Sequence, residues 1–406
     1  MRYTCVLAVA ALAVTACTDP TAPPASPRPS PRLSVEPLLA RDVFQRYVAL
    51  GTSNSQGVQS AGISAAAQRA AWPAQLAARV GVPFSQPLVQ DPGCSPPLLA
   101  PLAANVALVA AFGAFGAGDD LVSAVMTTCA PLAPGIALPA NNVAISGADV
   151  RDALTATVAS ATLRSARVGA LYSRVLAPGQ TQVTAMLAQQ PTFVSVELAA
   201  NDVLPASTGR VAAMTPYADW AADYDRVIAA VRSTGARGVL VGLPSDAARF
   251  PSIRRAREFF NQAPYLLALG VTVSLNCYFS TNHVFVPGYV LALVARAPTT
   301  ATCADVPGAT DYVLTAGDVA AINARMAQMN AHIQARARES GYAYFALSTL
   351  YDVPKPPLNL YNVLFSSTPF GATISLDGVH PSAQGQSLLA DAAAQAITTR
   401  YGLTIP

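Results

Sequence analysis

The sequence predicts an α/β fold in which helices cover both faces of a mainly parallel sheet, giving three layers, α/β/α. From about Arg41 onward, short apolar runs alternate with longer Ala-rich segments of helical length, the pattern of a parallel sheet with crossover helices. The chain has 406 residues, of which 52% are hydrophobic, enough for a sizeable core. Only 12% are charged and the formal net charge is +3, so nothing indicates a nucleic-acid partner.

The first apolar run, Tyr47–Leu50, passes directly into Gly51 and three small polar residues, Thr52-Ser53-Asn54. Ligands of parallel sheets bind beyond the carboxyl ends of the strands, so chemistry is expected at this turn. The predicted strands are Tyr47–Leu50, Val143–Ser146, Phe193–Leu198, Gly238–Gly242, Val271–Leu275 and Tyr344–Leu347. The predicted helices are Ala65–Val80, Val150–Val168, Tyr217–Thr234, Ile253–Leu269, Ala316–Glu339 and Ala383–Arg400.

The N-terminal segment predicts export. Arg2 precedes the apolar run Val6–Ala16, which is shorter than the about 20 residues that span a bilayer and suits a secretory signal. The motif "VTAC", ending at Cys17, resembles the lipobox of bacterial lipoproteins, whose cysteine is lipidated and becomes the N-terminus. A plain signal peptide with a chance cysteine is the alternative. We therefore predict a signal peptide at residues 1–16, and a lipidated cysteine with a Pro-rich tether at residues 17–40.

This organisation predicts an anchored protein of the bacterial cell envelope, facing the periplasm or the exterior, with its folded domain in residues 41–406. Two cysteine-bounded insertions are expected, near residues 94–140 and 277–303. Four cysteines in an oxidising compartment allow three pairings, and the sequence-local one is the simplest: Cys94–Cys129 and Cys277–Cys303. No CxxC spacing or His/Cys cluster occurs, so no metal site is expected.

A serine after a strand is usually a turn or cap residue, but the far end of the chain offers Ser53 two partners. The segment "LDGVHPSAQG" holds Asp377 and His380 three residues apart, just before a predicted helix. A base must reach a nucleophilic serine, and a carboxylate must hold the imidazole in the correct tautomer. An acid and a base on one loop at the carboxyl edge of the sheet can line up toward Ser53.

Four segments, "GTS", "NVAISGADV", "ELAANDVL" and "DGVHPSAQG", resemble in order the blocks of the SGNH/GDSL hydrolase superfamily, over about Arg46 to Tyr401. The segment "AAWPAQLAARVG" also matches the Trp-Pro-x-x-Leu pattern common there. The resemblance implies the family's three-layer fold with a flavodoxin-like sheet. It also implies a carboxylic ester hydrolase of esterase or lipase type that works through an acyl-enzyme without a cofactor.

Residue by residue, the resemblance implies a catalytic triad and an oxyanion hole. Ser53 is the expected nucleophile, His380 the base and Asp377 the residue that orients the base. The expected oxyanion donors are the N–H groups of Ser53 and Gly147 and the side-chain amide of Asn201.

Two residues depart from the family's motifs. Thr52 stands where the family usually has Asp, which is expected to alter hydrogen bonding around the nucleophile. Ala199 stands where the third block usually has Gly, so the backbone before Asn201 is a second point of difference. Neither residue is among the expected catalytic groups.

Other polar residues are weaker candidates. His332 and His283 are expected to be structural, and Asp202 is expected to be a hydrogen-bonding residue rather than an acid. Glu197 lies within an apolar strand, where an unpaired carboxylate is costly to bury, and the sequence offers it no partner. The glycine-rich residues 113–118 lack the Lys-Ser/Thr ending and the preceding strand of a phosphate loop.

Three functions are compatible with the sequence. The first is an esterase acting on small-molecule, lipid or glycan esters, and the second is an O-deacetylase of cell-envelope polysaccharide. The third is a non-catalytic surface lipoprotein that binds glycans or lipids, which loss of a triad residue would favour, although all three are present. The apolar residues between Cys94 and Cys129 form either a lid or wall for an acyl chain or an insertion that only packs on the sheet.

Overall fold

The computed structural model describes residues 39–105 and 129–406, so the predicted signal peptide, Cys17, most of the tether and residues 113–118 lie outside the described residues. Within the described part, the central sheet has four parallel strands in the order β1-β2-β3-β9. They are β1 (Tyr47–Gly51), β2 (Phe193–Glu197), β3 (Arg237–Gly242) and β9 (Ala343–Ala346). The predicted α/β fold with a mainly parallel sheet is confirmed.

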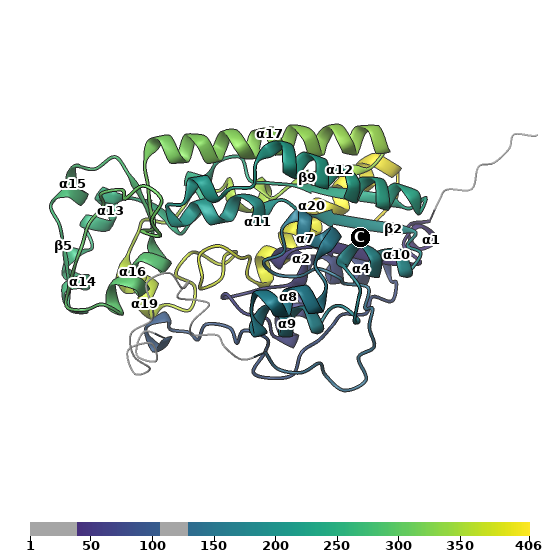
Figure 1. The fold of residues 1–406 in the computed structure, drawn as a ribbon, viewed down its shortest axis with the longest axis horizontal. Coiled ribbons are helices and arrows are strands. Elements are labelled where there is room, and N and C mark those ends of the chain that lie inside the picture. The colour runs from purple at the N-terminus through teal and green to yellow at the C-terminus, as the bar shows by residue number, and fades with distance from the viewer. Residues whose placement is uncertain (1–38, 106–128) are drawn as a thin grey trace, which may run out of the picture. The chain divides into compact units, whose positions relative to one another are not determined.

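The sheet separates two hydrophobic cores, which makes the three layers. Alternate residues of β1 point to opposite faces, so that Tyr47 and Ala49 join one core while Val48 and Leu50 join the other. Helices α4 (Trp72–Val80) and α20 (Ala383–Tyr401) cover the first face. The second face is covered by α7 (Val150–Thr155), α10 (Gln182–Ala188), α12 (Tyr217–Ser233) and α17 (Ala316–Ser340). The last two of these helices lie side by side (Figure 1).

The strand predicted at residues 143–146 is not formed, but the segment lies where that strand was expected. The segment runs beside β1, where Val143 N and Ile145 N donate to Ala49 O and Gly51 O at 2.9 and 3.0 Å, but it makes only an isolated bridge. Counting it as the outer neighbour of β1, the strand order becomes 2-1-3-4-5, the flavodoxin-like arrangement. The order reverses between β1 and β2, so their carboxyl ends border the crevice where such folds bind ligands.

The helix predicted at residues 253–269 is wrong over its first turn. Ile253–Arg255 forms β4, which pairs antiparallel with β6 (His283–Phe285), and β6 pairs with β8 (Val313–Leu314). Two short helices follow, α13 (Ala256–Phe260) and α14 (Ala263–Leu267). The pairing joins segments about thirty residues apart, and the local apolar period carries no trace of such long-range contacts.

The strand predicted at residues 271–275 exists but belongs to another sheet. β5 (Val271–Val273) pairs with β7 (Thr299–Ala301) in a separate two-stranded sheet. Both predicted disulfides are present, Cys94–Cys129 and Cys277–Cys303. The Cys277–Cys303 disulfide follows the ends of β5 and β7 and links the two ends of the inserted segment.

Three predicted helices are confirmed, as α12, α17 and α20, whereas two others are divided. Residues 65–80 form α3 (Ala65–Arg69) and α4, which begins at Trp72 with Pro73 in its first turn. Residues 150–168 are divided because Thr157 and Ser165 cap new helices, α8 (Val158–Arg164) and α9 (Ala166–Ser173). The remaining helical segments are α1 (Ala40–Val43), α2 (Ser53–Gln56), α11 (Ala200–Val203), α15 (Asn276–Phe279), α16 (Val286–Val294), α18 (Ser348–Tyr351), α19 (Leu360–Phe365), and the 3-10 turns η1 (Leu204–Thr208), η2 (Val211–Ala213) and η3 (Ala247–Arg249).

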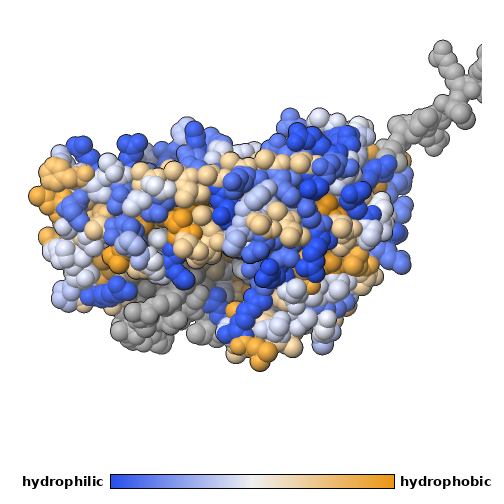
Figure 2. All heavy atoms as spheres, turned by 45° about the horizontal axis from the view of Figure 1, so that its top comes forward, coloured by the Kyte–Doolittle hydropathy of each residue, from blue (hydrophilic) through white to orange (hydrophobic). Residues whose placement is uncertain are grey.

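Apolar side chains are exposed around α15, where Leu275 and Phe279 are 61% and 72% exposed. Figure 2 shows hydrophobic atoms at the left end of the molecule, the end at which Figure 1 places α15. No helix within residues 39–105 or 129–406 is long and apolar enough to cross a membrane.

Candidate active site

The predicted nucleophile lies on a tight turn between β1 and α2. Thr52 is extended and Ser53 begins the helix, so the chain reverses within one residue of the strand. A Cβ on Gly51 would stand 2.6 Å from Ser55 Oγ, which explains why glycine ends the strand. Ser53 is 5% exposed and lies at the carboxyl end of β1, the edge at which parallel sheets bind ligands.

Asp377 and His380 form the hydrogen-bonded pair that their spacing predicts. His380 Nδ1 lies 2.8 Å from Asp377 Oδ2, and the carboxylate also accepts from the N–H groups of Ala61, Val379 and His380 at 2.5, 2.9 and 2.8 Å. Burial by itself raises the pKa of Asp377, but the facing His380 and these hydrogen bonds lower it below its ordinary value. The lowered pKa keeps the carboxylate ionised, and the carboxylate holds the Nδ1 side of the His380 ring.

Ser53 and His380 open onto one pocket, although they lie more than 300 residues apart in the sequence. Asn201 lines the same pocket, and Gly147 and Asp377 line the groove beside it. Among the hydrogen bonds of the described residues there is none from Ser53 to His380.

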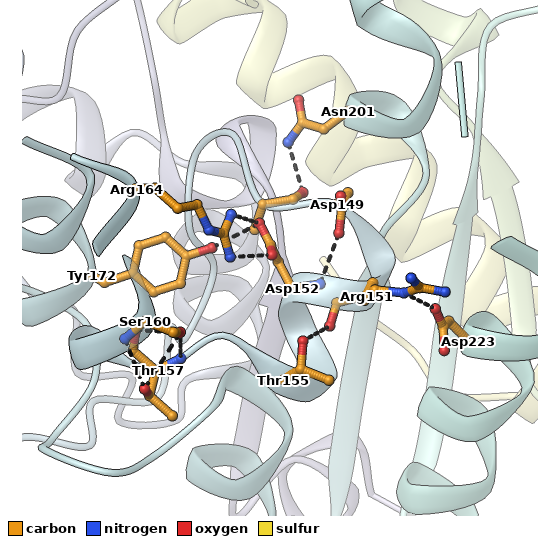
Figure 3. A network of polar contacts seen from close by, with 11 residues as sticks. Asp149, Arg151, Asp152, Thr155, Thr157, Ser160, Arg164, Tyr172, Asn201 and Asp223 are labelled. Atoms are coloured by element: carbon orange, nitrogen blue, oxygen red, sulfur yellow. Dashed lines mark hydrogen bonds and ion pairs between the residues drawn. The ribbon is translucent and has the colours of Figure 1, made fainter. Parts of the chain in front are cut away.

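The two other predicted oxyanion residues meet at the start of α7. Gly147 has φ of +78°, and no atom lies within 4 Å of the position that a Cβ would take, so backbone conformation rather than space favours glycine there. Asn201 Nδ2 donates to Ala148 O at 2.8 Å, and Asp202 Oδ2 accepts from Val150 N at 3.2 Å. Figure 3 shows Asn201 bonded to the backbone just before Asp149, which caps α7. The segment "ELAANDVL" therefore holds the backbone of the segment "NVAISGADV".

A family model described as GDSL-like Lipase/Acylhydrolase matches residues 47–393. The chain belongs to this family. It is accordingly a carboxylic ester hydrolase.

Two solved structures illustrate what the GDSL hydrolase is similar to. An extracellular lipase from Streptomyces rimosus is 19% identical, with 85% of this chain and 98% of that chain covered and a TM-score of 0.35. An acetyl-xylooligosaccharide esterase from a Geobacillus species is 13% identical, with 87% and 94% covered and a TM-score of 0.32. No curated protein sequence matches the chain.

The structure explains both departures of the GDSL hydrolase from its family's motifs. The Thr52 hydroxyl donates to the carboxylate of Glu197 at 2.8 and 3.0 Å, so Glu197 has a partner that the sequence did not reveal. The only sequence signal for this contact was the coincidence of an unusual Thr52 and a carboxylate within a buried strand. Ala199 has φ of 171°, outside the left-handed region that favours glycine, so alanine is tolerated there.

The two weaker histidine candidates, His332 and His283, do not line the pocket beside Ser53. His332 Nε2 is 2.7 Å from Asp225 Oδ1, and its other ring nitrogen is 3.3 Å from the Tyr217 hydroxyl, as expected for a structural histidine. His283 is on β6, where burial lowers its pKa and its Nδ1 has no hydrogen-bond partner among the described residues. The described part of the chain holds no group of three His, Cys, Asp or Glu side chains arranged to bind a metal ion.

Asp202 is buried and its pKa is raised to about 7, chiefly by burial and in part by the nearby carboxylate of Asp149. One of its oxygens accepts the Val150 N–H, while Oδ1 has no partner among the described residues. It faces the start of α7 rather than the pocket, which agrees with the expected hydrogen-bonding role.

The pocket beside Ser53 is apolar and narrow, with a cavity volume of about 70 Å³. Side chains from several elements contribute to its wall, among them Val203, Leu243, Phe250, Phe285, Ile322 and Met326. Ligand pockets generally have mostly apolar walls with a few polar groups that fix orientation, and Ser53, Asn201 and His380 supply such groups here. The pocket can therefore receive an apolar group next to the serine.

Proposed function

We propose that the GDSL hydrolase cleaves carboxylic esters through an acyl-enzyme formed on Ser53. The observation that carries this proposal is the opening of Ser53 and His380 onto one pocket, with His380 held by the ionised Asp377. A serine, a base and an orienting carboxylate are the three parts that nucleophilic acyl transfer requires.

In the first half of the reaction, Ser53 Oγ attacks the ester carbonyl while His380 Nε2 takes its proton. The oxyanion is stabilised by the N–H groups of Ser53 and Gly147 and by Asn201 Nδ2, whose amide has a second N–H besides the one bonded to Ala148. The tetrahedral intermediate expels the alcohol, which receives the proton from His380. A water activated by His380 then releases the carboxylic acid and restores Ser53.

The pocket supports an ester whose acyl part is an apolar chain. The acyl group stays bonded to Ser53, and Ser53 opens onto a pocket whose apolar wall extends to Ile322 and Met326 on α17. An acetyl group would leave most of that wall without a contact, so the geometry favours a lipid-type ester over O-deacetylation of a polysaccharide. Each buried CH₂ contributes about 0.8 kcal/mol to binding, which makes chain length a sensitive readout.

The direct test is kcat/KM for a series of p-nitrophenyl esters of increasing chain length, with Ser53→Ala as the inactive reference. We expect a maximum at a chain longer than acetate and no turnover by folded Ser53→Ala protein. A maximum at acetate would support the deacetylase instead. A folded wild-type protein without esterase activity, unreactive toward a fluorophosphonate probe, would support the non-catalytic binding protein.

We also propose that the enzyme is exported and anchored through lipid on Cys17 after removal of residues 1–16. The lipobox-like "VTAC" and the Pro-rich stretch that follows it support this location. Lipoprotein-type modification supplies more than one acyl chain, which stable anchoring requires. Mass spectrometry of protein extracted from the native membrane should find an acylated Cys17 at the N-terminus, whereas an unmodified soluble chain with another start would refute the anchor.

A further inference from the structure

We infer that Glu197 is a positioning residue for the nucleophile, because its buried carboxylate holds the turn that carries Ser53. Glu197 is the last residue of β2, 2% exposed, and in register with Gly51 on the neighbouring strand. The inference rests on the proposed role of Ser53. It assigns Glu197 no contact with substrate and no proton transfer.

Five donors converge on this carboxylate, and all come from residues that flank Ser53. Thr52 donates its N–H at 3.0 Å and its hydroxyl at 2.8 Å. Ser55 donates its N–H at 3.3 Å and its hydroxyl at 3.1 Å. The fifth donor is the side-chain amide of Asn54 at 3.4 Å. The carboxylate thus accepts hydrogen bonds from residues before and after Ser53.

The donors omit the N–H of Ser53 itself. The first N–H groups of a helix have no partner within the helix, and Glu197 accepts those of Thr52 and Ser55. Among the backbone hydrogen bonds of the described residues, none has Ser53 N as its donor. Glu197 therefore fixes the turn and leaves free the N–H that the oxyanion needs.

Stability alone does not explain a carboxylate at this position. The neighbouring strand residues Val194 and Val196 are apolar and fully buried, as expected inside a parallel sheet. Glu197 forms no ion pair with a basic side chain within the described residues. Burial raises its pKa even though the hydrogen bonds from Thr52 and Ser55 act in the opposite direction. In this inference, the cost of burying the carboxylate is offset because Glu197 fixes the geometry of the turn that carries Ser53.

The test compares Glu197→Gln with Ser195→Ala, a matched change on the same strand. Ser195 is two residues earlier on the same face, fully buried, and its hydroxyl lies 2.9 Å from the Tyr47 hydroxyl, away from the turn. The Gln amide would present a donor to groups that are themselves donors, so the turn should shift. Small displacements of catalytic groups cost roughly 100-fold.

We expect Glu197→Gln to lower kcat about 10- to 100-fold with KM changed less than about 3-fold. Labelling of Ser53 by a fluorophosphonate should slow by a similar factor. Ser195→Ala should lower the Tm while keeping kcat and the labelling rate. If folded Glu197→Gln has full kcat and Ser53→Ala is inactive, the positioning role of Glu197 is overturned while the proposed function stands. An active Ser53→Ala would instead overturn the proposed function.

If Glu197→Gln does not fold, the combined Thr52→Val and Ser55→Ala variant removes both hydroxyl donors and leaves the carboxylate in place. Lowered kcat and slower labelling at unchanged KM would support the inference. Unchanged kcat and labelling would overturn the role of the two hydroxyl contacts in positioning Ser53, because only the N–H groups of Thr52 and Ser55 and the Asn54 amide would then hold the carboxylate.

Discussion

The side-chain amide of Asn201 donates a 2.8 Å hydrogen bond to the backbone carbonyl of Ala148, the residue after Gly147. The next residue, Asp202, accepts the N–H of Val150 at 3.2 Å. Two consecutive side chains after β2 therefore hold the segment that carries Gly147. Figure 3 shows the first of these contacts, which Asn201 makes. In the proposed mechanism, two of the three oxyanion donors are thus positioned as one unit.

Asn201→Ala should lower kcat by about 10²–10³, the usual cost of an oxyanion donor, with a smaller change in KM. The reason is that the contact strengthens only when negative charge develops on the substrate oxygen. Steady-state kinetics on a p-nitrophenyl ester measures both parameters. Asn282→Ala is the control, since its amide donates to Cys303 O at 3.0 Å in the inserted segment. Equal kcat for the Asn201 variant and wild type would remove Asn201 from the oxyanion hole.

Ser53→Ala and His380→Ala should each abolish nearly all turnover, and the double variant should be scarcely worse than either single one. Residues that act as one catalytic unit give non-additive losses. Asp377→Ala should retain more activity, because in the proposed mechanism Asp377 orients the base and exchanges no proton with the substrate. The measurement is kcat/KM for the three single variants and the double variant, each checked for folding by circular dichroism. Multiplicative losses would indicate that Ser53 and His380 act independently.

Asp202→Asn should change how stability depends on pH. The pKa of Asp202 is raised to about 7 in the folded protein, so between about pH 4 and pH 7 the folded state binds more protons than the unfolded state. The free energy of unfolding of wild type should therefore fall as pH rises through this window, whereas the variant lacks this contribution because an amide does not titrate. Urea unfolding at pH 4.5, 6 and 7.5 measures the difference. A stability gap between the two proteins that does not vary with pH would contradict a raised pKa.

Met326→Trp should shorten the preferred acyl chain. Met326 is 3% exposed on α17 and lines the pocket beside Ser53, so an indole would occupy space proposed for the end of the chain. Turnover of short esters should persist while that of long ones falls. Gln328→Trp is the control, because it places the same side chain on the exposed side of the same helix. An unchanged chain-length profile for a folded Met326→Trp protein would show that the acyl chain does not bind beside Met326.

Much of the fold was determined by local sequence. The buried strands β1, β2 and β3 are near-continuous apolar runs, and α12, α17 and α20 have the length and composition of helices, so each was predicted to within a few residues. The pair Asp377 and His380 was predictable for the same reason, because three residues on one turn suffice to bring the groups together. The two disulfides were also predicted from the sequence, because each joins cysteines that are neighbours along the chain.

Tertiary structure alone decided the contacts between distant segments. Glu197 meets Thr52 across 145 residues, because strands β1 and β2 lie side by side, and no local pattern encodes that partner. The same holds for β4, which pairs with a strand in an insertion, and for the acyl pocket, whose wall includes Met326 of α17. Periodicity and turn residues specify what one segment forms by itself. Which side chains then share a buried space depends on how the whole chain packs, and that decides where a buried carboxylate finds its donors.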